Sequence, residues 1–324
     1  MPVPSLFRTL CTAALAACLI SFPASADDSR LLRCRALPRD IDQLAPESPV
    51  RMPDGTVDLL GRNAEGDLVR VPVTVHDGKP LGHHSSLPGA GLQTRVDAEA
   101  FPTLAATGLH NPAELDAIES ITGRTLSELD ALARPDEASS AGFIAADETL
   151  IGVIREDNRR VRALGLRHPD LARPLFHVWN AALARHQGHP KLESAYYNGG
   201  EIRFDVLATR GYQESIFDDG IRGSHEIHIE REPTADELAF LKKRYDDPED
   251  PEKLASLIRR LSVIDTGEMV AFYIQQYGFY EGHTGYRADP ITIAFVFGLV
   301  PLEKLEATFP GRLDEALREH FVGR

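Results

Sequence analysis

The sequence predicts an α+β fold, with a small N-terminal β-rich module and a C-terminal module in which several helices pack a three-stranded antiparallel meander. Apolar residues alternate with a period of two over 201–232 and recur at helical spacing over 147–186. Residues 134–142 (RPDEASSAG) have the composition of a linker. We therefore expect four parts: a signal peptide (1–26), an N-terminal module (27–133), the linker (134–142) and a C-terminal domain (143–324).

The N-terminal module is expected to hold short strands followed by a helix. Two strands around an Asp-Gly turn are predicted within 50–60. Residues 67–75 alternate as a half-buried strand does, and Pro72 places this strand at a sheet edge, because proline cannot donate a hydrogen bond to a neighbouring strand. A helix is expected over 111–133.

The C-terminal domain is expected to begin with two amphipathic helices, at 147–164 and 170–186. The period then changes to two, which predicts the strands of the meander at 201–210, 212–217 and 224–232.

Helices are expected to complete the domain, and several have a recognisable start. Thr234 with Glu237 forms a capping box, and Asp265 with Glu268 is expected to cap a later helix. Asp289-Pro290 is a typical N-cap and first-turn pair before the apolar run ITIAFVFGLV. A further helix is indicated by Leu254, Leu257, Ile258 and Leu261, and two short helices are predicted at 301–308 and 312–321.

The N-terminus predicts export. Residues 1–26 combine Arg8, an apolar run and the small residues Ala24-Ser25-Ala26, which is typical of a cleaved signal peptide. A rival interpretation is a lipobox that ends at Cys18, which would give an outer-membrane lipoprotein. No later segment has the apolar length of a membrane span. We expect a soluble periplasmic or secreted protein.

Charge and cysteine content exclude several classes of protein. The formal net charge is −14, so the basic surface that nucleic-acid binding requires is absent. Of the three cysteines, Cys11 and Cys18 lie in the signal peptide, and Cys34 alone cannot form an internal disulfide. The sequence has no GxSxG, Walker A, GxGxxG, HExxH or EF-hand motif, and no nucleotide cofactor is expected.

The first candidate site lies in the strand 224–232. Glu226, His228 and Glu230 share one face of this strand and could bind a divalent metal or hold a general base. The alternative is a solvated sheet face. Arg203 and Asp205 on the neighbouring strand are expected to point to the same face of the sheet, where they could form cross-strand charge pairs.

The second candidate lies on the helix 170–186. His177 and Asn180 are three residues apart, so their side chains meet, and Arg173 lies one turn earlier. This polar strip either is exposed to solvent or lines a pocket.

The third candidate is the glycine-rich stretch 278–290 (GFYEGHTGYRADP). His283 and Glu281 could transfer protons, and Arg287 before a helix N-terminus could attract an anion. The objection is Asp289, because a capping carboxylate would occupy the anion position and pair with Arg287. The stretch would then be a rigid connector.

These candidates together predict one polar, tyrosine-rich ligand site in the C-terminal domain. The predicted catalytic residues are His228, His283, Glu281 and His177; the predicted ligand-binding residues are Tyr197, Asn198, Asp205, Tyr280, Tyr286 and Arg287; and the metal ligands would be Glu226, His228 and Glu230. The function indicated is hydrolysis by histidine and carboxylate, with or without a metal. The alternative is a non-catalytic periplasmic binding or envelope-structural protein, whose ligand would be a small molecule, a glycan or a protein.

Overall fold

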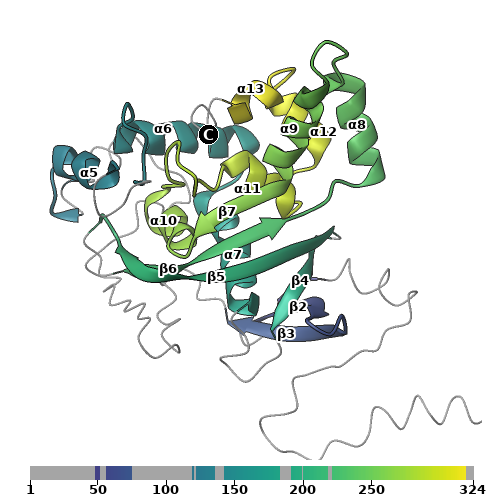
Figure 1. Ribbon diagram of the computed structural model, residues 1–324, viewed down its shortest axis with the longest axis horizontal. Coiled ribbons are helices and arrows are strands. Elements are labelled where there is room, and N and C mark those ends of the chain that lie inside the picture. The colour runs from purple at the N-terminus through teal and green to yellow at the C-terminus, as the bar shows by residue number, and fades with distance from the viewer. Residues whose placement is uncertain are drawn as a thin grey trace, which may run out of the picture. The chain divides into compact units, whose positions relative to one another are not determined.

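The computed structural model describes residues 48–51, 56–74, 119, 122–135, 142–182, 191–198, 200–217 and 221–318 (Figure 1). Within these ranges the predicted α+β fold is confirmed, since helices pack against an antiparallel sheet of seven strands. The predicted signal peptide, Cys34 and residues 136–141 of the linker lie outside the described residues.

All seven strands belong to one sheet. They are β1 (Val50–Arg51), β2 (Thr56–Asn63), β3 (Leu68–Thr74), β4 (Leu192–Tyr197), β5 (Gly200–Glu214), β6 (Arg222–Glu230) and β7 (Val263–Gly267). Their order is β1-β2-β4-β5-β6-β7, and β3 pairs with β2. Since β2 pairs with β4 through residues 61–63, strands from either side of the predicted linker join one sheet. The division into modules at 134–142 stays a prediction.

The sheet differs from the predicted meander at three points. Residues 201–210 and 212–217 were expected to be two strands, but β5 runs from Gly200 to Glu214 with one irregularity in its pairing to β6, and residues 215–217 lie beyond its end. Strand β4 was not predicted. The expected helix cap at Asp265 is wrong, because residues 263–267 pair with β6 as β7, and Glu268 instead accepts hydrogen bonds from Ser224 and His225.

Except for the helix expected over 111–133, which is interrupted at residues 123–125, the helices lie close to where they were predicted. They are α5 (Leu126–Ala133), α6 (Leu150–Leu164), α7 (His168–Ala182), α8 (Ala235–Tyr245), α9 (Pro251–Ser262), α10 (Val270–Tyr277), α11 (Pro290–Val296), α12 (Leu302–Thr308) and α13 (Leu313–Arg318). The capping box of Thr234 with Glu237 is confirmed, and so is the Asp289 cap of α11. None of the described helices is long and apolar enough to cross a membrane.

The hydrophobic core lies between the sheet and the helices. Helix α7 packs on strands β2 to β5, while α9 and α11 pack on β7 (Figure 1). Helix α11 also contacts α6, and α10 contacts α7. The rings of Phe217 and Tyr277 stack at 3.8 Å between centroids, with Tyr273 packed edge-on. This packing fixes the ends of α10 and α11, and therefore the segment that joins them.

Candidate functional site

Residues 278–289, here called the 278–289 loop, connect α10 to α11. Gly278 ends α10 in the left-handed conformation with a φ of 63°, where its N–H bonds the carbonyls of Tyr273 and Ile274. At the other end Asp289 caps α11 by accepting the N–H of Ile291 at 2.8 Å. Phe279, Tyr280 and Glu281 are buried. The two ends of the loop are therefore part of the core, and residues 283–287 between them are half-buried.

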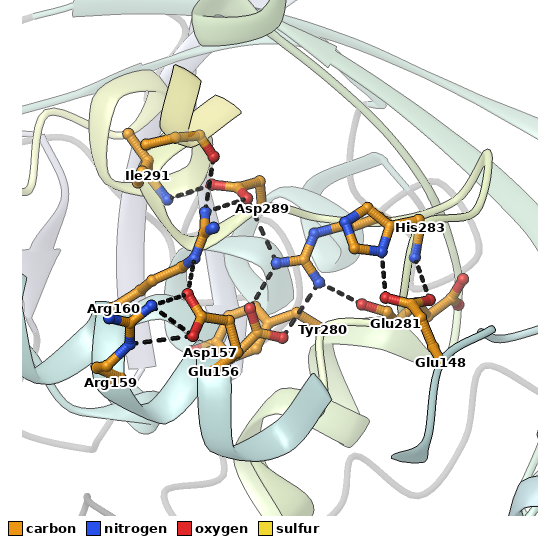
Figure 2. A network of polar contacts seen from close by, with 12 residues as sticks. Glu148, Glu156, Asp157, Arg159, Arg160, Tyr280, Glu281, His283, Asp289 and Ile291 are labelled. Atoms are coloured by element: carbon orange, nitrogen blue, oxygen red, sulfur yellow. Dashed lines mark hydrogen bonds and ion pairs between the residues drawn. The ribbon is translucent and has the colours of Figure 1, made fainter. Parts of the chain in front are cut away.

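The central feature of the site is a pair formed by Glu148 and His283. Glu148 lies immediately before Thr149, the N-cap of α6, and its Oε1 contacts Nδ1 of His283. Its Oε2 accepts the backbone N–H of Ala145 at 2.7 Å and that of His283 at 2.8 Å. Figure 2 shows the two side chains facing each other.

The environment of Glu148 sets the protonation state of the pair. Burial raises the pKa of Glu148, but the hydrogen bonds from the His283 ring and from the N–H groups of Ala145 and His283 more than offset it, so the pKa lies below its usual value. An ionised carboxylate only accepts hydrogen bonds, so Nδ1 of His283 carries the proton. In the neutral ring this tautomer leaves Nε2 as the nitrogen without a proton.

Gly282 makes this contact possible. A Cβ at this position would lie 2.3 Å from Oε2 of Glu148 and 2.9 Å from the Cα of Ile144, which is backbone and cannot move aside. We expect Gly282→Ala to separate Glu148 from His283 and to lower the free energy of unfolding by about 1–3 kcal/mol, measured by urea denaturation. The matched control is Gly267→Ala, since a Cβ there meets nothing within 4 Å. Equal stability of the two variants would contradict the close approach.

Glu281 is a strained and buried acid. Its backbone has a φ of 63°, a conformation that non-glycine residues keep only when the surrounding structure imposes it. Burial raises the pKa of its carboxyl to about 8, against the opposing effects of the Thr284 hydroxyl, which donates to Oε2 at 3.0 Å, and of Arg287. The side chain is therefore mostly protonated at neutral pH.

Arg287 joins the loop to two helices. Its guanidinium forms a bidentate pair with Asp157 on α6 and donates to the backbone carbonyl of Glu281. It also lies 3.3 Å from Oδ2 of Asp289. Burial raises the pKa of Asp157 to about 6, and the charge of Arg287 opposes this rise. Arg160 lies 3.6 Å from the same Oδ2 of Asp289.

This arrangement decides between the two interpretations of Arg287. The capping carboxylate of Asp289 occupies the helix N-terminus and contacts Arg287, as the objection to an anion site anticipated. The guanidinium charge is balanced by Asp157 and Asp289.

A cavity of about 190 Å³ opens beside the Glu148–His283 pair. It lies along the first turns of α6, and its wall residues are Glu148, Thr149, Gly152, Val153, Glu156, Asp157, His283 and Arg287. No tyrosine is among these described wall residues. Tyr280 instead is fully buried, and its hydroxyl is 3.0 Å from Nδ1 of His168. Tyr286 reaches the sheet, where its hydroxyl donates to Glu226 at 2.7 Å.

His177 lies in a different environment from His283. It is buried with Asn180, so the exposed interpretation of this strip is wrong. Burial lowers the pKa of His177 to about 3, which keeps the ring neutral, and its Nδ1 is 3.2 Å from the hydroxyl of Tyr197. Asn198 follows with a φ of 48° and donates to the carbonyl of Phe297 at 2.8 Å.

The face of β6 carries the cross-strand charge pairs that were the alternative to a site. Asp205 is opposite His228 in the register, and Arg203 is opposite Glu230, to which its Nε lies at 3.2 Å. Nδ1 of His228 contacts Asp265 of β7 at 2.6 Å, on a half-exposed surface.

The metal ligands predicted on this face each have another contact. Glu226 accepts from Tyr286, His228 contacts Asp265, and Glu230 pairs with Arg203. Among the described residues, no group of three or more His, Cys, Asp or Glu is arranged to hold a metal ion.

The structure thus gathers part of the predicted site and adds residues that were not predicted. Glu281, His283 and Tyr280 lie together with Glu148, Asp157, Asp289 and Arg160 in Figure 2. Asp157 and Arg160 had a sequence signal, because both lie in phase with the apolar face of α6 that includes Ile154 and Val161. Glu148 had no such signal. That the three predicted histidines share one cleft stays a prediction.

Comparison with known proteins adds no family. No protein-family model, no curated protein and no solved structure matches this chain. The site itself offers an imidazole paired with an ionised carboxylate on the wall of a cavity, and the neutral carboxylic acid of Glu281 lies two residues before His283 in the same loop.

Proposed function

We propose that this protein is an exported hydrolase in which His283, oriented by Glu148, activates a water molecule. The observation that supports the proposal is the Glu148–His283 pair on the wall of a cavity large enough for a small substrate. Export is supported by the signal-peptide pattern of residues 1–26.

The proposed reaction needs only proton transfer and positioning. Nε2 of His283 takes a proton from water while the water oxygen bonds to the electrophilic carbon of the substrate. The bond to the leaving group breaks, and the imidazolium returns the proton to that group. Glu148 stabilises the imidazolium that forms between these steps, as a carboxylate does in other histidine-dependent hydrolases.

The test is turnover of a panel of chromogenic esters, anilides and glycosides by the purified mature protein. We expect His283→Ala to lower kcat/KM by about 10²–10⁴-fold, and Glu148→Gln to lower it less, because the imidazole remains but loses its orientation. The control is His228→Ala, which removes a half-exposed histidine outside the cavity wall and should leave kcat/KM unchanged.

Two outcomes would contradict the proposal. Either His283→Ala retains wild-type turnover at an unchanged melting temperature, or no member of the panel is hydrolysed by the wild type.

The second candidate function is ligand binding without turnover. It is favoured by the hydrogen bonds that Glu148 accepts from two backbone N–H groups. These bonds connect residue 145 to residue 283, so Glu148 also has a purely structural role. A binding protein would keep its ligand when His283 is replaced by Ala and would turn over none of the panel.

A further inference from the structure

We propose that the cavity beside Glu148 and His283 accepts an uncharged molecule with a carbonyl or similar acceptor group, and rejects anions and cations of the same shape. The proposal rests on the proposed function only in taking this cavity as the substrate site. The observation that supports it is that each charged group described below on the cavity wall already has a partner within the protein.

The carboxylates of the wall already have cationic or N–H partners within this chain. Glu148 accepts from two backbone N–H groups and from the His283 ring. Glu156 accepts from Arg159 at 2.7 Å and from Nε of Arg160 at 2.9 Å. A cationic ligand would have to displace one of these partners.

The positive charge of Arg287 on the cavity wall also has partners of opposite charge. Arg287 has a side chain only 5% exposed, and Asp157 and Asp289 lie on its guanidinium. An anionic ligand would therefore lose its hydration without gaining a counter-charge, which costs more than the same transfer of a neutral group.

One donor on this arginine has no partner. Nε of Arg287, a residue of the cavity wall, is buried and has no hydrogen-bond partner among the described residues. A buried donor without a partner is costly, and a ligand oxygen that displaces the atoms covering Nε would satisfy it. Because the guanidinium charge is already balanced, an uncharged carbonyl oxygen satisfies this donor without adding a charge.

The experiment uses three probes of one shape and different charge: benzamide, benzoate and benzamidinium. Each is titrated into the full mature protein labelled at the histidine ring carbons, and the His283 signal is assigned by its absence from the His283→Ala spectrum. We expect benzamide to shift this signal with an affinity about tenfold or more above that of either ion. Tighter binding of benzoate or benzamidinium, or no shift with any of the three, would overturn the proposal.

A variant tests the cause of the preference. Asp157→Asn removes the bidentate counter-charge of Arg287 at nearly constant shape, so benzoate should bind about tenfold tighter than it binds the wild type, while benzamide binding changes little. Asp170→Asn is the matched control, because it removes the same charge from the surface pair with Arg167. If Asp157→Asn binds benzoate with the same affinity as the wild type, the charge of Asp157 is not what keeps anions from Arg287.

The two proposals fail in different ways. Hydrolysis with a preference for anionic probes would overturn this inference alone. Binding of benzamide without turnover of any panel substrate would overturn the proposed hydrolysis alone.

Discussion

Arg287→Met should lower the free energy of unfolding by about 3–5 kcal/mol, the range found when one partner of a buried ion pair is removed. Asp157 is 1% exposed on its side chain and would lose both hydrogen bonds from the guanidinium. The carbonyl of Glu281 would lose its arginine donor as well. Urea denaturation at neutral pH measures the change.

Two further variants separate the charge from the packing. Arg287→Met combined with Asp157→Leu should be more stable than Arg287→Met alone, because no buried charge is then left without its partner. Arg159→Met should change stability by less than about 0.5 kcal/mol, since its side chain is 77% exposed. If Arg287→Met unfolds at the same urea concentration as the wild type, the network does not stabilise the 278–289 loop.

Glu281→Gln should stabilise the protein at alkaline pH and have little effect in acid. The pKa of Glu281 is raised from its ordinary value of 4.5 to about 8 in the folded protein. Below pH 4.5 the carboxyl is protonated in the folded and in the unfolded protein, so its contribution to stability is fully present. Between 4.5 and about 8 the unfolded chain ionises and the folded protein does not, so the wild type loses about 1.4 kcal/mol per pH unit.

Glutamine imitates the protonated carboxyl and removes this loss. Urea denaturation at about pH 5 and about pH 9 should therefore show nearly equal stability in acid and an advantage of a few kcal/mol for Glu281→Gln in alkali. The control is Glu65→Gln, an exposed position where both pH values should give a change within about 0.5 kcal/mol. An advantage that is independent of pH would mean that Glu281 is ionised in the folded protein.

Local signals in the sequence predicted the elements whose cause is local. The capping box of Thr234 with Glu237 fixes the start of α8, and the period-two pattern places Ile202 and Phe204 on the buried face of β5. Strand β7 has only five residues and forms because β6 offers it an edge, which is a tertiary effect. Residues 265–268 also carry a plausible helix cap, so the local pattern alone was misleading there.

In the candidate site too, the local features were predictable from the sequence and the tertiary contacts were not. The 278–289 loop was identified from its glycines and polar side chains, and the position of Asp289 was sufficient to argue against an anion site. The partner of His283 was not predictable, because Glu148 lies 135 residues away and only the packing of α6 against α11 brings it close. Asp157 could have been found, since a carboxylate in phase with an apolar helix face needs a buried partner.

The position of β2 has a consequence for the order in which the chain assembles. The hairpin of β2 with β3 closes over a few residues, whereas the pairing of Gly61 with Ala195 closes a loop of well over a hundred. Loop closure becomes entropically more costly with length, and a high contact order slows folding. We infer that β1, β2 and β3 pair early, and that residues 61–63 of β2 stay unpaired on the side away from β3 until β4 docks. During that interval these residues of β2 offer unpaired backbone groups to another molecule.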